Sequence, residues 1–293
     1  MTLYEKRWKI TKNYDKIEVM GRKRDLVSKT ASRFARPVSV VMPKRKEKYQ
    51  KAPKLAIVMF HRIALEPSRD AASRDLVMTV ETFRRYLELF RSRFQICTLH
   101  EAEKLLKRDL EKPLIVFTFD DGYEDFYVNA FPILKELGIP VNQNIIARYA
   151  DERTPGYLNW DEVMEMQRSG LVEFGSHTYD LHYYKEGRPM LESLSREEIL
   201  ADLERAQKSF LSHVEFSPDV LAWPYGVAPR NVPREDLARL GIRFELNAIS
   251  GMNFGPVDFS RLKRFVALDY ETPEKLLAII EGYCNLGFLL GKK

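Results

Sequence analysis

The chain has 293 residues, of which 45% are hydrophobic and 30% are charged, a balance typical of a globular protein with one large or two small domains. Its charged N-terminus lacks the apolar core of a secretory signal, and no stretch approaches the roughly 20 apolar residues that a membrane-spanning helix needs. Composition therefore argues against a secreted or membrane-spanning protein and predicts a cytoplasmic one.

The basic charge lies at the N-terminal end of the chain. Residues 1–52 contain 16 Lys+Arg and 5 Asp+Glu, a net charge of +11, whereas residues 53–293 contain 31 and 37, a net charge of −6. We expect residues 1–52 to form a basic extension and residues 53–293 to form the globular domain. The extension can be a loosely packed tail, or it can dock on an anionic membrane surface, which would hold the protein at the inner membrane face. Nucleic acid is a weaker third alternative, because no recognition module accompanies the charge.

From residue 54 onward, apolar runs alternate with amphipathic stretches. Short apolar runs predict strands, and apolar residues at helical spacing predict helices. The predicted strands are 55–60, 94–99, 114–119, 141–147, 171–174, 220–223, 242–246 and 265–268. The predicted helices are 80–90, 101–108, 127–137, 160–169, 196–212, 234–240 and 273–283.

This alternation predicts an α/β fold with parallel strands that are buried on both faces. Seven or eight strand–helix units fit a distorted or incomplete β/α barrel. An open doubly wound sheet is the alternative, although no glycine-rich phosphate loop follows the first strand. Because a barrel carries its chemistry at the carboxyl ends of its strands, catalytic residues should lie where the predicted strands end.

Two adjacent carboxylates, Asp120 and Asp121, follow the predicted strand 114–119. Burying two carboxylates is unfavourable unless each has a partner. Consecutive side chains of a strand point to opposite sides, but a turn at Gly122 can bring both to the rim. One aspartate can then bind a cation while the other remains free as a base. A simple polar turn is the alternative explanation.

Two of the five histidines, His177 and His182, follow the predicted strand 171–174. Two imidazoles so close in sequence suggest ligands for zinc or a similar metal. On a regular helix the two positions are about 140° apart, so the rings can converge only in a loop or a distorted turn. With one carboxylate they would form an open catalytic site, in which water completes the coordination.

Two further features lie at strand ends. The turn Trp223–Gly226 follows the strand 220–223, and the backbone N–H of Tyr225 can donate toward a pocket, although packing alone also explains an aromatic-Pro-aromatic turn. His61 follows the first strand, where it is either catalytic or structural. The other histidines are expected to be surface or capping residues: His100 and His213.

Three motifs, in this order, resemble those of the polysaccharide deacetylases, which form carbohydrate esterase family 4 and share the NodB homology domain. They are Thr118–Tyr123, His177–His182 and Trp223–Gly226, and the similarity extends over residues 54–280. The resemblance implies a distorted (β/α)7 barrel, with residues 53–293 as the catalytic domain. The six-residue histidine motif and His61 look most like the branch that deacetylates poly-N-acetylglucosamine.

The resemblance also implies a role for each residue. Asp120 would be the general base, His61 the general acid, and the Tyr225 N–H would stabilise the negative charge that develops on the carbonyl oxygen. The expected metal ligands are Asp121, His177 and His182. The expected substrate contacts are Trp223, Pro224 and Tyr123. The metal would be a divalent ion, with zinc as the first expectation and cobalt, nickel, iron or manganese as alternatives.

The implied function is metal-dependent hydrolysis of the N-acetyl group of an amino sugar of the N-acetylglucosamine type, with release of acetate. One alternative is a deformylase or deacetylase that acts on a lipid-linked or nucleotide sugar at the inner membrane face. Another is a non-catalytic glycan-binding relative, although a binding module would not need the general base Asp120.

Three departures from the family pattern bear on the site. Ala222 stands where many members carry an arginine, so the motifs contain no residue that would orient Asp120. No histidine lies beyond His213, so the usual C-terminal acid motif is absent, which favours His61 as the acid. Residues 142–144 (Asn-Gln-Asn) occupy positions that are usually apolar or small in relatives, and they either face the pocket or reflect local packing.

Overall fold

The structure is a computed structural model that describes residues 54–66, 76–185, 187–268 and 272–290. Its central feature is one sheet, in which seven strands follow the order β11-β10-β7-β6-β5-β1-β12. These strands are β1 (Lys54–Phe60), β5 (Leu114–Phe119), β6 (Val141–Ile145), β7 (Val172–Ser176), β10 (Val220–Ala222), β11 (Phe244–Leu246) and β12 (Asn253–Phe254). Two short strands lie off this path: β4 (Gln95–Ile96) pairs with β5, and β13 (Phe265–Val266) pairs with β1.

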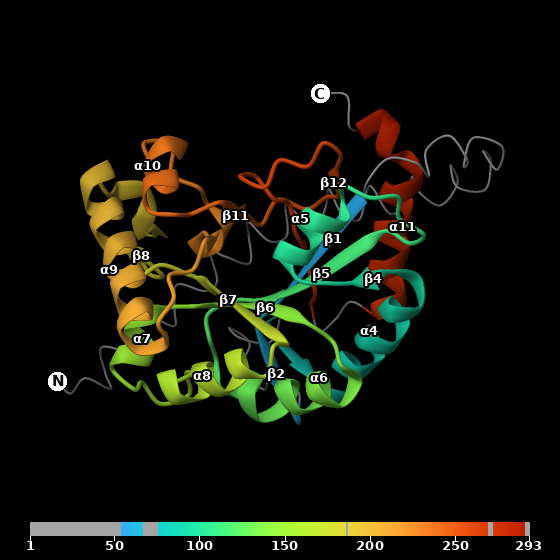
Figure 1. Ribbon diagram of the computed structural model, residues 1–293, viewed down its shortest axis with the longest axis horizontal. Helices are drawn as coiled ribbons and strands as arrows, with labels where there is room; N and C mark the ends of the chain where they lie inside the picture. The colour runs from blue at the N-terminus through green and yellow to red at the C-terminus, as the bar shows by residue number, and fades with distance from the viewer. Residues whose placement is uncertain (1–53, 67–75, 186, 269–271, 291–293) are drawn as a thin grey trace.

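The sheet is curled, and helices cover its outer side. Its described pairings are parallel except for that of β12 with β1. The covering helices include α4 (Val80–Arg93), α6 (Phe131–Leu137), α8 (Trp160–Arg168) and α9 (Arg196–Val214). Figure 1 shows them around the curved sheet, whose strand path runs from β11 to β12 without closing. The predicted α/β fold with an incomplete barrel is therefore confirmed.

The two longest central strands owe their apolar sequences to burial on both faces. β1 and β5 pair in register along six residues each. Leu55 and Ile57 of β1 point into the barrel interior, where they belong to the same core as Val116. Val58 and Phe60 point the other way and join the core between the sheet and the helices. Strands covered on both sides gain stability at every position, which explains their continuous apolar runs.

Three helices begin at capping boxes. Thr98, Asn159 and Ser195 each accept a hydrogen bond from the backbone N–H three residues later, and a glutamate at that later position accepts one from the backbone N–H of the cap. These caps begin α5 (Leu99–Leu105), α8 and α9. The other described helices are α7 (Ala147–Asp151), α10 (Arg234–Arg239) and α11 (Pro273–Leu290), with a π-helical segment η3 (Phe126–Ala130) leading into α6.

Short elements connect the main ones. Two ribbons flank the sheet: β2 (Arg62–Ala64) with β3 (Val77–Thr79), and β8 (Tyr184–Lys185) with β9 (Arg188–Pro189). Two short 3-10 helices are η4 (Met190–Ser193) and η5 (Pro224–Gly226).

Three of the differences from the sequence prediction have a clear physical reason. The strand expected over 94–99 is only two residues long, because Thr98 caps α5 and the helix begins at Leu99. The strand expected over 141–147 ends at Ile145, because Ala147 begins α7. β12 was not expected, since a two-residue strand carries no periodic signal.

The predicted basic extension, residues 1–52, lies outside the described residues. Its contacts with a membrane or a nucleic acid, and the boundary at residue 53, therefore stay predictions. Within the described ranges, no helix is both long enough and apolar enough to cross a membrane.

Candidate metal and catalytic site

The candidate residues meet at one edge of the sheet, where neighbouring parallel strands end. His61 follows β1, Asp120 and Asp121 follow β5, and His177 follows β7. These strands and β6 are consecutive neighbours in the sheet and run in the same direction. The fold therefore brings the side chains to one rim, as a barrel does with its catalytic residues.

A left-handed turn after β5 gives the two carboxylates different surroundings. Asp121 and Gly122 both have a φ of 74°, a region that aspartate tolerates better than most residues and glycine adopts freely. A Cβ atom at Gly122 would lie 3.0 Å from the Ile145 side chain, so the turn also needs the small residue. As a result, Asp121 faces two histidines while Asp120 faces an arginine.

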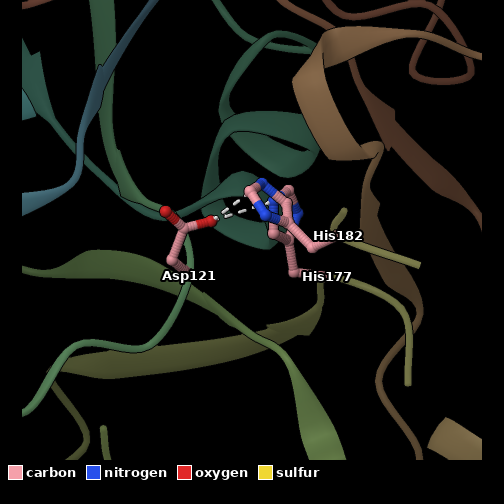
Figure 2. A group of neighbouring side chains, drawn as sticks. All are labelled: Asp121, His177 and His182. Carbon is pink, nitrogen blue, oxygen red and sulfur yellow. Dashed lines mark ion pairs between the residues drawn. The ribbon is translucent and has the colours of Figure 1, made fainter. Parts of the chain in front are cut away.

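Asp121, His177 and His182 form a group with the geometry of a metal centre. The Asp121 Oδ1 atom lies 3.2 Å from His177 Nε2 and 3.3 Å from His182 Nε2. The three ligand atoms all lie within 4.8 Å of one another, and Figure 2 shows the side chains pointing toward a common centre. Two ligand atoms bound about 2.0–2.1 Å from a tetrahedral zinc ion are separated by roughly 3.3–3.4 Å. The observed separations therefore fit ligands of one small divalent ion.

The hydrogen bonds of this group also fit a metal. His177 Nδ1 lies 2.8 Å from the carbonyl oxygen of Ala222, so Nδ1 carries the proton and Nε2 presents its lone pair to the group. Asp121 Oδ1 is buried without a hydrogen-bond partner. Buried lone pairs that face one another are unfavourable unless a cation lies between them. The donor set, two imidazoles and one carboxylate, is that of an open catalytic zinc site.

The electrostatics of the group favour neutral imidazole on His182 and an ionised carboxylate on Asp121. Burial lowers the pKa of His182 to about 4. Burial raises the pKa of Asp121, but His182 and His177 lower it by more, so it lies below its usual range. Burial lowers the pKa of His177, but the neighbouring carboxylates of Asp121 and Asp120 raise it by more, so the net pKa lies above its usual range.

The segment between the two histidines is a tight turn, which explains how positions five apart converge. Thr178 has a φ of 71°, and its Oγ1 atom accepts a hydrogen bond of 3.1 Å from the Leu181 N–H. The N–H groups of Tyr179 and Asp180 donate to the carboxylate of Asp202 on α9, at 2.8 and 2.9 Å. The distorted backbone that convergence requires is therefore present.

Asp120 is held by Arg264, a residue that the sequence motifs did not reveal. The Arg264 Nη1 atom donates to Asp120 Oδ1 at 2.9 Å, and Nη2 lies 2.8 Å from Oδ2. The motifs themselves contain no residue that orients Asp120, since Ala222 occupies the usual arginine position. Arg264, which follows β12 in the chain, binds the same carboxylate instead. Burial raises the pKa of Asp120, but Arg264 and then His177 lower it by more, so the net pKa lies below its usual range.

The Asn-Gln-Asn segment of β6 divides between the two faces of the strand. Asn144 Nδ2 donates to Asp120 Oδ1 at 2.8 Å, so this residue also supports the carboxylate. Asn142 lies deeper, where it accepts from the Leu99 N–H at 3.1 Å and donates to Glu173 at 3.1 Å. Gln143 is buried, and its side-chain amide has no hydrogen-bond partner.

His61 lies beside the two carboxylates and interacts electrostatically with both. Its Nδ1 atom is buried without a hydrogen-bond partner. Burial lowers its pKa, so the imidazole rests in the neutral form. The position fits the predicted acid role, which stays a prediction.

The Trp-Pro-Tyr turn sends only its tyrosine toward the metal group. Tyr225 has a φ of 57°, and its ring centroid lies 4.5 Å from that of His182. Trp223 is 1% exposed and its indole N–H donates to Glu245, while Pro224 is also buried. An enclosed side chain offers no face to a sugar, so this geometry gives Trp223 and Pro224 a packing role and does not support them as substrate contacts.

Tyr123, the third expected substrate contact, is half-buried at the same rim. Its ring stacks on that of Tyr157, with centroids 5.0 Å apart, and the Arg62 guanidinium lies 5.0 Å from its centroid. A partly exposed aromatic ring can pack against a sugar, so its predicted role is compatible with its position.

The sequence is similar to known proteins over part of its length. Residues 107–244 match the family model for polysaccharide deacetylase. The chain is 29% identical over 192 residues to the poly-beta-1,6-N-acetyl-D-glucosamine N-deacetylase of Escherichia coli K12, a match that covers 54% of this chain and 28% of that protein. It is 35% identical over 127 residues to the protein of the same name from Staphylococcus aureus N315, covering 41% and 43%. The chain thus spans less than half the length of these curated relatives.

Solved structures share the fold. The Streptococcus pyogenes deacetylase PplD, in complex with acetate, is similar with a TM-score of 0.68 and 22% identity, over 78% of this chain and 99% of that one. IcaB from Ammonifex degensii is similar with a TM-score of 0.65 and 24% identity, over 80% and 98%.

Proposed function

We propose that this chain, whose residues 107–244 match the family model for polysaccharide deacetylase, is a deacetylase that removes the N-acetyl group from an N-acetylglucosamine-type glycan by metal-dependent hydrolysis, which releases acetate. The observation that carries the proposal is the pairing of two groups at one rim. Asp121, His177 and His182 offer three ligand atoms, and Asp120 lies beside them as an ionised carboxylate with its own arginine.

The predicted ligands would hold a divalent metal, for which zinc is the first expectation from a donor set of two imidazoles and a carboxylate. Such an ion, when bound, supplies Lewis acidity for the amide carbonyl and for water. Cobalt, nickel, iron and manganese remain alternatives, because the same ligands accept them.

Asp120 would act as the general base. Its pKa lies below the usual range, so it is ionised at neutral pH and able to accept a proton from the attacking water. Arg264 and Asn144 fix the carboxylate from the side of the barrel interior. A held carboxylate loses little orientational freedom in the reaction, which is the main benefit of such support.

His61 would act as the general acid. The amine of the sugar must gain a proton as the carbon–nitrogen bond breaks. His61 is neutral at rest, so it would first take up the proton that Asp120 removes from the attacking water and then pass it to the amine. Its buried Nδ1 atom has no other hydrogen-bond partner. The Tyr225 N–H would donate to the carbonyl oxygen as negative charge develops there. Because water, and not a side chain of the protein, would attack the acyl carbon, no acyl-enzyme is expected.

Release of acetate and formate by the purified protein tests the proposal. The substrate panel contains N-acetylglucosamine oligomers, nucleotide sugars and lipid-linked amino sugars, each with and without a chelator. We expect acetate from the oligomers, and loss of that activity with chelator and in Asp121→Ala. Asp161→Ala is the matched control, because Asp161 is an exposed carboxylate that forms an ion pair with Arg153. Activity that survives both the chelator and Asp121→Ala would contradict metal dependence.

The panel also separates the alternatives. Formate release, or activity confined to a lipid-linked or nucleotide sugar, would favour a deformylase or precursor deacetylase. Metal binding without any release would favour a glycan-binding relative. A cytoplasmic location, with or without docking on the inner membrane face, is a separate proposal that depends on residues 1–52.

A further inference from the structure

Asp202 connects the longest helix of the barrel wall to the turn that carries the two histidines. It lies on α9, whose neighbouring residue Leu203 is buried in the core. Its Oδ1 atom accepts from the Tyr179 N–H at 2.8 Å, and Oδ2 accepts from the Asp180 N–H at 2.9 Å. Burial raises the pKa of Asp202 to about 6, while the two N–H donors oppose the rise. The carboxylate is therefore mostly ionised at neutral pH and can accept from both.

The turn is held from a second side by the start of α7. The Ala147 N–H donates to the Thr178 carbonyl at 3.2 Å, and the Arg148 N–H donates to the Tyr179 carbonyl at 3.1 Å. Two carbonyl groups of the turn thus accept hydrogen bonds from α7, while two consecutive N–H groups of the turn donate hydrogen bonds to Asp202. Two rigid elements together determine the path of the backbone from His177 to His182.

This path matters because the two imidazoles do not converge on a regular helix. The left-handed Thr178 reverses the chain, and the next two residues are those that Asp202 holds. Without the carboxylate, two adjacent N–H groups would need other partners, and the turn would relax. A relaxed turn would change the separation of the Nε2 atoms of His177 and His182. A displacement of a metal ligand by about 0.5 Å is enough to weaken metal binding.

We propose that Asp202 is a positioning residue for the metal centre, which fixes the His177–His182 spacing by binding the two backbone N–H groups between them. The inference rests on the proposed metal-binding function of that turn. Asp202 is not one of the three residues whose ligand atoms converge, so it acts through the backbone. Outer-sphere contacts of this kind typically contribute about 10–100-fold to metal affinity.

The test measures the zinc dissociation constant of the full chain by competition with a chromophoric chelator. The variants are Asp202→Ala and Asp202→Asn, of which the asparagine keeps one acceptor oxygen. Glu204→Ala is the control, because Glu204 lies on the same helix, is 51% exposed and forms an ion pair with the exposed Lys208. We expect a dissociation constant raised about 10–100-fold in Asp202→Ala, an intermediate rise in Asp202→Asn and no change in Glu204→Ala.

Hydrogen exchange at the Tyr179 and Asp180 amides, with thermal unfolding of the chelator-treated proteins, separates positioning from general stability. We expect faster exchange at these two amides in Asp202→Asn, even if Asp202→Ala folds too poorly to measure. A lower unfolding temperature with zinc affinity within threefold of the parent would overturn the proposal. If the parent protein itself bound no zinc, the proposed function would fail together with this inference, whereas unchanged affinity in the variants would remove the inference alone.

Discussion

Arg264 and Asp120 form a two-point ion pair in the barrel interior, with both side chains almost completely buried. The arginine also donates from Nε to the Asn247 carbonyl at 2.9 Å, and Nη1 lies 3.3 Å from the Thr118 hydroxyl. A buried ion pair is tolerated only when such additional bonds satisfy the charges. The proposed base is thus held by a part of the chain 144 residues away.

Replacing Arg264 by methionine should destabilise the protein by about 3–5 kcal/mol, because it leaves a buried carboxylate unpaired. Deacetylation should fall by at least about 100-fold, because Asp120 loses its orientation and its ionised form is disfavoured. Chemical denaturation and acetate release measure the two effects. Arg239→Met is the control, since this arginine is exposed and its partner Asp236 keeps a second ion pair with Arg196, so the change should cost less than about 1 kcal/mol.

The double variant Asp120→Asn with Arg264→Met separates lost charge pairing from lost packing. Removing both partners leaves no unpaired charge, so the double variant should be more stable than Arg264→Met alone. Equal instability of the two would mean that Arg264 contributes packing rather than compensation of the Asp120 charge.

Asp120→Asn alone should reduce turnover by about 100-fold or more while zinc remains bound. Asparagine cannot accept the proton of the attacking water, whereas the metal ligands are other side chains. Parallel assays of acetate release and zinc content check this. Loss of zinc from the variant would contradict the division of roles between Asp120 and Asp121.

The motifs were predictable because each is a contiguous stretch that begins where a strand ends. Apolar runs located β5 and β7, and the carboxyl ends of parallel strands meet at one edge. Arg264 was not predictable from the sequence, since only the tertiary pairing of β13 with β1 brings Arg264 to the site. The available signal was an arginine directly before the apolar strand residues Phe265 and Val266.

The alternation of side chains along β10 also predicts that Ala222 and Trp223 lie on opposite sides of the sheet. Ala222 belongs to the interior core of the barrel, whereas Trp223 belongs to the core between β10 and the helices. Adjacent strand residues point to opposite sides, so an interior Ala222 implies an outward Trp223. For Asn144 and Asp202, the partners lie 24 and 22 to 23 residues away, beyond the range of any local pattern.

Gly175→Ala should disturb the proposed base from a neighbouring strand. A Cβ atom at Gly175 would collide with Asn144 Oδ1 and lie 3.0 Å from Val220 Cγ1. We expect destabilisation by about 1–3 kcal/mol, together with lower activity, because Asn144 must move away from Asp120. Denaturation and acetate release check both effects. The same substitution in an Asn144→Ala background should be less harmful, and equal harm would mean that Val220 is the limiting contact.

Stability should depend on pH through His100, far from the metal group in the sequence. His100 was expected to be a surface or capping residue, but its ring lies between two carboxylates, 2.9 Å from Glu173 and 2.9 Å from Asp219. Hydrogen bonds to Asp219 and then to Glu173 raise its pKa to about 10. The unfolded value is about 6.5, so the raised pKa stabilises the folded state fully below pH 6.5. That contribution declines as the pH rises and is lost above about pH 10.

The difference in unfolding midpoint between the parent protein and His100→Gln measures this contribution. Groups that titrate equally in both proteins cancel in the difference, so the remaining slope reports the imidazole. We expect the difference to be largest near pH 6, to shrink through pH 8 and 9, and to fall to the neutral hydrogen-bond contribution near pH 10. A difference that stays constant from pH 6 to 10 would mean that His100 binds the two carboxylates without a change in its protonation.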